Sequence, residues 1–69
     1  MKVDVNKLKG KMAEKQLTAE ALATTIGIDG STFYRKLKAN GLTFTVAQMH
    51  RIAEVLQLSK EEATQIFLQ

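Results

Sequence analysis

Residues 18–37 read TAEALATTIGIDGSTFYRKL and contain two short amphipathic segments separated by Gly27. Glycine adopts a positive φ angle at little steric cost, so Gly27 can end the first segment in a left-handed cap. The side chain of Asp29 can accept hydrogen bonds from the free N–H groups of a helix start, so we expect it to cap a second helix that begins near Gly30. Two short helices joined by a tight, glycine-containing turn form a helix-turn-helix, and the stretch predicts this motif.

The two segments share an apolar face. Ala23 is small enough for the point at which the axes of two steeply crossing helices come closest. Larger apolar side chains recur at helical spacing on both sides of the turn, namely Leu22, Ile26, Phe33 and Leu37. Their burial would leave the polar face of the second segment exposed.

Cap signals predict five helices and therefore an all-α fold. Asp4 and Thr18 are N-cap residues before the first two helices, and Asn40-Gly41 signals the end of the third. Thr45 to Gln48 and Ser59 to Glu62 have the spacing of capping boxes before the last two helices. The expected helices are residues 5–15, residues 19–26, residues 30–39, one starting after Thr45 and one starting after Ser59.

Three of these helices carry further stripes at helical spacing. The apolar stripe of the fourth helix comprises Val46, Met49, Ile52, Ala53 and Leu56. In the fifth helix, Ala63, Ile66 and Phe67 are expected to face inward. The first helix has an apolar face and, opposite it, a stripe of Lys7, Lys11 and Lys15. We expect this lysine stripe to be a solvated face.

Composition points to one small domain. The chain has 69 residues, of which 45% are hydrophobic and 25% charged, and it has no cysteine. We expect a single domain spanning residues 1–69, with no disulfide, metal, other cofactor or small-molecule ligand. The N-terminal sequence MKVDVNKLKG lacks the apolar core of a signal peptide, and no apolar run approaches the roughly 20 residues that span a bilayer. A cytoplasmic protein without a membrane partner is expected.

Positive charge is concentrated in the part of the chain that contains the motif. The formal net charge is +3, and residues 1–38 hold eight Lys or Arg against four Asp or Glu, whereas the remainder holds two against three. This asymmetry favours a polyanionic partner. Together with the helix-turn-helix it indicates double-stranded DNA, whose major groove admits the second helix of the motif.

The motif and the fourth helix resemble the DNA-binding domain of the phage Cro and C1 repressor family, which is XRE-like. The resemblance covers about residues 5–67 and is carried by Leu22-Ala23, Gly27-Ile28, Ser31-Thr32-Phe33, Arg35 and Ile52 to Leu58. It implies a compact five-helix, lambda-repressor-like fold with the helix-turn-helix in helices 2 and 3. It also implies a transcriptional repressor that binds operator DNA in a bacterial host cell, associated with the nucleoid. In size the chain is closer to Cro than to a full-length C1 repressor.

Three positions depart from the family pattern. Many members carry glutamine at the positions of Ala19 and Gly30, where it contacts the DNA backbone and a base respectively. Lys36 occupies a position that is often apolar, and Leu37 supplies the apolar anchor one residue later. The two glutamine contacts are therefore not carried over to this chain.

Base contacts are expected from Ser31, Thr32, Tyr34 and Arg35. Arg35 is the first choice, because its planar guanidinium can donate to O6 and N7 of guanine at the same time. Ser31 and Thr32 can reach either a base edge or a phosphate. Tyr34 can reach a phosphate through its hydroxyl or a thymine methyl through its ring. The sequence leaves these alternatives open.

DNA backbone contacts are expected from residues that flank this surface, namely Thr18, Lys36, Lys38, Thr43 and Thr45. The two lysines supply positive charge, and the threonines lie at helix starts or in a loop, where hydroxyl and N–H donors bind phosphate. Such contacts strengthen binding and fix its register without reading the base sequence.

A dimer would increase the number of base pairs read, because one short helix contacts only a few. We expect a weak homodimer, formed in solution or only on DNA. Ile66, Phe67 and Leu68 are consecutive and cannot all face inward on one helix. The candidate interface residues are Leu58, Phe67 and Leu68. A frayed apolar terminus explains the same residues equally well.

Other functional classes compete with a specific regulator. A protein-binding module would use the same fold without DNA, whereas a nonspecific nucleic-acid binder would need only the net charge. Salt dependence and the ratio of specific to random-duplex affinity distinguish these classes. An enzyme is not expected, because nothing brings Ser31, His50 and Asp29 together as nucleophile, base and orienting acid, and His50 has no suitably spaced second metal ligand.

Overall fold

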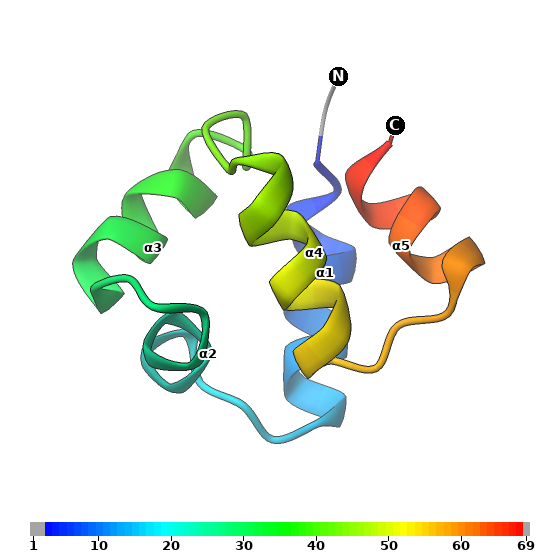
Figure 1. Cartoon of the computed structure of the whole chain (residues 1–69), viewed down its shortest axis with the longest axis horizontal. Helices are drawn as coiled ribbons and strands as arrows, with labels where there is room; N and C mark the ends of the chain where they lie inside the picture. The colour runs from blue at the N-terminus through cyan, green and yellow to red at the C-terminus, as the bar shows by residue number, and fades with distance from the viewer. Residues whose placement is uncertain (1–2, 69) are drawn as a thin grey trace.

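Polar side chains mark the starts of the helices in this protein. The computed structural model describes residues 3–68. These residues form α1 (Val5–Glu14), α2 (Ala19–Ile26), α3 (Gly30–Lys38), α4 (Val46–Val55) and α5 (Lys60–Phe67), and no strand occurs among them (Figure 1). The predicted all-α class is confirmed. Helices α1 and α3 each end one residue earlier than expected, with Lys15 and Ala39 as their C-caps.

Four of the five expected N-caps form as the sequence predicts. Asp4 and Thr18 each accept a hydrogen bond from the backbone N–H three residues later, both at 3.0 Å. Thr45 and Ser59 begin complete capping boxes. The prediction for Asp29 is confirmed in position but wrong in bonding: it is the N-cap residue of α3, which begins at Gly30, but its side chain makes no capping hydrogen bond within the described residues. Its carboxylate is exposed, so water can satisfy it instead.

The turn between α2 and α3 has the predicted left-handed geometry. Gly27 has φ 86° and ψ 27°. The Ile28 N–H donates to the Ala23 carbonyl at 2.9 Å and closes the end of α2. Ala23 is fully buried, so α2 and α3 can approach closely. In Figure 1, α3 and α5 lie on opposite sides of the molecule, with α1 and α4 between them.

One hydrophobic core joins the five helices. Its largest fully buried side chains are Phe33, Leu8, Leu22, Ile52, Leu56 and Ile66. The stripe predicted for α4 is only partly correct, because Val46 is 66% exposed, whereas Met49 and Ala53 are half-buried. Val46 is the first residue of α4 and lies at a groove between α4 and α5, where no described segment covers it.

The residues before α1 are held against the loop after α3 and against the end of α5. Val3 is buried beside Gly41, where a Cβ would lie 2.5 Å from the Val3 Cβ. Gly41 also has φ 72°, so this position requires glycine for its space and for its backbone conformation. The Asp4 N–H donates to the Ile66 carbonyl at 2.7 Å. The Val3–Gly41 contact holds the start of α1 beside the last turn of α3, and the Asp4–Ile66 bond holds it beside α5.

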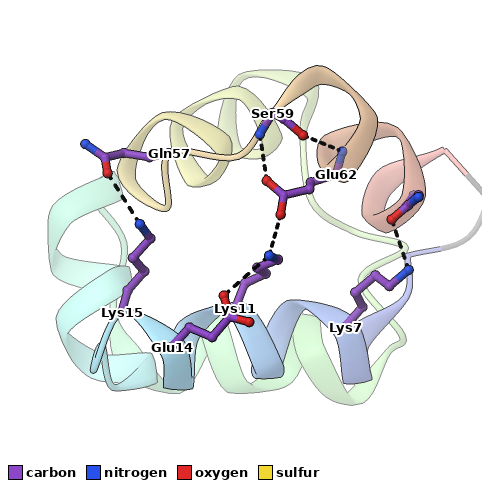
Figure 2. A network of polar contacts seen from close by, with 8 residues as sticks. Lys7, Lys11, Glu14, Lys15, Gln57, Ser59 and Glu62 are labelled. Carbon is purple, nitrogen blue, oxygen red and sulfur yellow. Dashed lines mark hydrogen bonds and ion pairs between the residues drawn. The ribbon is translucent and has the colours of Figure 1, made fainter.

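Lys7 and Lys15 of the α1 stripe are exposed, as expected, whereas Lys11 is half-buried, and all three ammonium groups also contact another part of the chain (Figure 2). Lys7 Nζ donates to Gln65 Oε1 of α5 at 3.1 Å. Lys15 Nζ donates to Gln57 Oε1, in the loop before α5, at 3.4 Å. Lys11 lies between them and pairs with α5 as well. The stripe therefore fastens α5 and its preceding loop onto α1.

We call the contacts of Lys7, Lys11 and Lys15 with α5 and its preceding loop the α1–α5 clasp, and Glu62 lies at its centre. Its carboxylate forms an ion pair with Lys11 and accepts a hydrogen bond from the Ser59 N–H at 2.9 Å. Lys11 also pairs with Glu14 at 3.3 Å. The Lys11 ammonium, followed by the Ser59 N–H, lowers the pKa of Glu62 to about 2, and the hydrogen bond to Glu62 raises the pKa of Lys11. One carboxylate thus joins the start of α5 to the middle of α1.

The glycines allow a matched test of backbone geometry. Gly27→Ala should destabilise the protein by about 1 kcal/mol, because alanine pays the cost of a positive φ. Gly41→Ala should cost about 2–4 kcal/mol, since Val3 must also move. Gly10→Ala should stabilise by about 1 kcal/mol, because Gly10 is helical and no described atom would lie within 4 Å of the added Cβ. Urea unfolding followed by circular dichroism measures all three, and equal losses would contradict this assignment.

Glu62 should make folding stability sensitive to acid. Its folded pKa of about 2 lies below the ordinary value of 4.5, so its contribution is present above about pH 4.5 and is lost as the pH falls toward 2. Glu62→Gln keeps the capping hydrogen bond and removes the charge. The variant should have a lower Tm than the wild type near neutral pH, and the two Tm values should converge in acid. Glu61→Gln, a neighbouring exposed carboxyl, is the control and should retain the wild-type profile. Parallel profiles for Glu62→Gln and wild type would refute the clasp.

Candidate nucleic-acid interface

The outward face of α3 carries hydroxyl and cationic side chains. Its exposed members are Ser31, Tyr34, Arg35 and Lys38, with Tyr34 49% exposed. On the opposite face, Phe33 and Leu37 are buried in the core. Because the exposed residues are one, three or four positions apart, they lie on one arc of the helix. The structure thus brings together four of the predicted contact residues on one outward surface.

Arg35 is held by its neighbour one turn earlier. Its Nη2 donates to Thr32 Oγ1 at 3.2 Å. The guanidinium is exposed, and its other N–H groups make no hydrogen bond within residues 3–68. Thr32 itself is half-buried and uses its hydroxyl oxygen as the acceptor. Thr32 therefore orients the arginine side chain.

Lys36 braces the loop that follows α3. Its Nζ donates to the Thr43 carbonyl at 2.8 Å and lies 5.9 Å from the centre of the Phe44 ring. Phe44 in turn packs against Phe33 with a centroid distance of 5.5 Å and an interplanar angle of 56°. The sequence predicts only a phosphate contact for Lys36, and this bracing role was not predicted. An aromatic residue in the loop was the available signal, since a lysine can pack on its ring.

The three predicted threonines are exposed at helix starts and in the α3–α4 loop. Thr18 and Thr45 accept capping hydrogen bonds through Oγ1, both at 3.0 Å. Each hydroxyl keeps its proton for donation to an outside acceptor such as a phosphate oxygen. The side chain of Thr43 is exposed, and its backbone carbonyl is held by Lys36, so its hydroxyl is also accessible to a phosphate.

The two ends of α3 differ in charge. The first turn forms a cleft with α2 that includes the carboxylates of Glu20 and Asp29, whereas the last turn carries Arg35, Lys36 and Lys38. A Cβ at Gly30 would lie 3.1 Å from the Glu20 Cγ, and Ala19 is 8% exposed. The two positions that depart from the glutamine pattern are therefore closely packed against their surroundings. The cationic charge of α3 is concentrated at its C-terminal end.

An apolar groove runs between α4 and α5 on another face. Leu68, one of the predicted interface residues, is 63% exposed and lines it beside Val46. Phe67 is 4% exposed, because most of its side chain belongs to the core, and it contributes only a small part of the groove wall. Leu58 is half-buried against the core. Of the three predicted residues, Leu68 offers the largest apolar surface to a partner.

The residues considered for catalysis do not form one cluster. Asp29 and Ser31 line the α2–α3 cleft, whereas His50 lines the α4–α5 groove. Within residues 3–68, no group of three His, Cys, Asp or Glu side chains is arranged to hold a metal ion. In the same part of the chain, none of the helices has the length and apolar character needed to cross a membrane.

The chain matches a family model of DNA-binding domains. The model, described as a Cro/C1-type HTH DNA-binding domain, matches residues 7–64. The matched range contains all of α2, α3 and α4, with the Gly27 turn and the exposed arc of α3. No curated protein and no solved structure gives a match.

Proposed function

Because the chain belongs to the family of Cro/C1-type helix-turn-helix DNA-binding domains and is thereby a DNA-binding regulator, we propose that it binds a specific operator and represses transcription. The observation that carries this proposal is the exposed arc of α3, with Arg35 and Lys38 outward and Phe33 anchored in the core. An α-helix fits the major groove of duplex DNA, where base edges are distinguishable. The family is typically non-enzymatic, and repression requires only that the bound protein exclude RNA polymerase from an overlapping promoter.

Arg35 is proposed to read guanine. Thr32 already holds one guanidinium nitrogen, which reduces the conformational freedom that binding would have to remove. The remaining N–H donors of Arg35 can then meet O6 and N7 of the base. Ser31 and Tyr34 share the arc and are proposed to contact neighbouring bases, with Thr32 contributing through Arg35 or directly.

Backbone phosphates are proposed to bind around this helix. Lys38 is exposed and makes no ion pair with another described residue, so its charge is available to a phosphate. Thr18 and Thr45 can donate their hydroxyl protons while they cap α2 and α4. Lys36 and Thr43 would act together, because the ammonium that holds the Thr43 carbonyl still has two N–H donors.

A weak homodimer is proposed to bind two half-sites about one helical turn apart. Its contact would use Leu68 and the adjoining α4–α5 groove, with smaller contributions from Phe67 and Leu58. The surface is small, so association would be strongest when both copies are on DNA. We further propose that residues 1–69 act as one domain and that the protein acts in the cytoplasm of a bacterial host, on the nucleoid.

Selection from a random duplex pool at about physiological salt is the first test. Sequencing of the enriched DNA should reveal a two-fold symmetric motif, because a dimer presents two copies of α3. An enriched motif without symmetry would support specific binding but would contradict the dimer. Absence of enrichment would overturn operator binding and favour a protein-binding module or a nonspecific nucleic-acid binder. In purified transcription, unchanged output from an occupied operator would refute repression.

Two variants separate base readout from phosphate binding. Arg35→Ala should lose about 1–3 kcal/mol of binding to the selected sequence, and Arg35→Lys should recover little of it, because lysine lacks the planar fork. Lys38→Ala should weaken all duplexes similarly and lower the salt slope by about 1. Fluorescence anisotropy with selected and scrambled duplexes measures both effects. Equal losses from Arg35→Ala and Lys38→Ala on every duplex would remove Arg35 from base readout.

A further inference from the structure

A polar groove lies where the first turns of α1 meet the last turn of α3. Its polar walls include Asn6 and Lys9 from α1, and Lys38 and Asn40 from the end of α3 and the residues after it. The groove exists because Val3 is buried against Gly41, which holds the two helices together at this point. It adjoins the C-terminal end of the exposed α3 arc.

The two lysines of this groove, Lys9 of α1 and Lys38 of α3, differ from the lysines of the α1 stripe. Lys7, Lys11 and Lys15 are all bonded to α5 or its preceding loop. Within residues 3–68, Lys9 and Lys38 make no ion pair or hydrogen bond through their ammonium groups.

The carboxylate that borders the groove does not neutralise these lysines through a direct ion pair. Asp4 lines the groove, but its side chain caps α1 by accepting the Lys7 N–H at 3.0 Å. No ion pair joins Asp4 to either lysine among the described residues. Two lysines and one carboxylate line the groove, so its charged lining is net positive. The groove therefore offers two cations and two side-chain amides to an anionic group.

We propose that this groove binds a backbone phosphate of the duplex that lies along α3. Lys9 and Lys38 would supply the charge, and the amides of Asn6 and Asn40 would donate hydrogen bonds to the phosphate oxygens. The site rests on the proposed DNA-binding function and adds α1 to the contact surface. A phosphate held at this end of α3 would fix how far the helix advances along the major groove.

Lys9→Gln is the direct test, with Lys60→Gln as its matched control. Both lysines are exposed and helical, but Lys60 begins α5, on the side of the molecule opposite α3 (Figure 1). Lys60 also lines the α4–α5 groove of the proposed dimer, so the test uses DNA to which a single copy binds. Binding is measured by anisotropy over a range of salt concentrations. The probe is a random-sequence duplex of about 10 base pairs, which spans about one helical turn and so offers a single half-site. Melting followed by circular dichroism checks that each variant is folded.

Loss of one phosphate contact has a defined signature. Lys9→Gln should lower the slope of log affinity against log salt by about 0.9, which corresponds to about eightfold weaker binding at about 0.1 M salt and about twofold at about 0.5 M. Lys60→Gln should leave the slope nearly unchanged. Asn6→Ala removes no charge and should weaken binding roughly threefold with an unchanged slope.

The outcomes distinguish this site from the proposed function. An unchanged slope for Lys9→Gln, while the wild type binds DNA with a steep slope, would overturn the groove site alone. Equal slope changes for Lys9→Gln and Lys60→Gln would overturn it too, because both would then act through net charge. A wild-type protein that shows no salt-dependent duplex binding would overturn both the DNA-binding function and the site.

Discussion

The left-handed turn at Gly27 is the constraint on which the arrangement depends. It turns the chain sharply within a few residues and sets α3 across α2, where Ala23 leaves room for the close approach (Figure 1). Phe33 then reaches the core and packs against Phe44. Because the Phe33 face of α3 is buried, the opposite face, which carries Arg35, is exposed to solvent. The geometry of the candidate DNA surface is thus a consequence of how the opposite face packs.

The lysines show why net charge alone is a poor guide to a binding surface. Those of the α1 stripe are bonded to α5 and its preceding loop, and Lys36 is bonded to the loop after α3. Lys9 and Lys38 make no such bond with other described residues. Similar side chains therefore have different roles, because only some of them have an acceptor within reach after folding.

The features that the sequence predicted correctly depend on residues close together in the chain. N-caps, capping boxes and the glycine turn involve bonds across three to five positions, so their residue types and spacing carry the information. Asp29 shows the limit of this approach, because a suitable cap residue at the right position still leaves its side chain in solvent. Val46 shows another, since a stripe predicts which side of a helix is apolar but not whether another helix covers its end.

By itself, the sequence determined the five helices, the turn between α2 and α3 and the outward side of α3, because short-range hydrogen bonds and helical spacing govern them. Tertiary structure decided the role of each lysine, the burial of Phe67 beside an exposed Leu68, and the meeting of α1 with the end of α3. These features depend on contacts between segments far apart in the chain, such as Lys11 with Glu62 and Val3 with Gly41. No local pattern encodes such pairs, since they form only when the helices pack around a shared core.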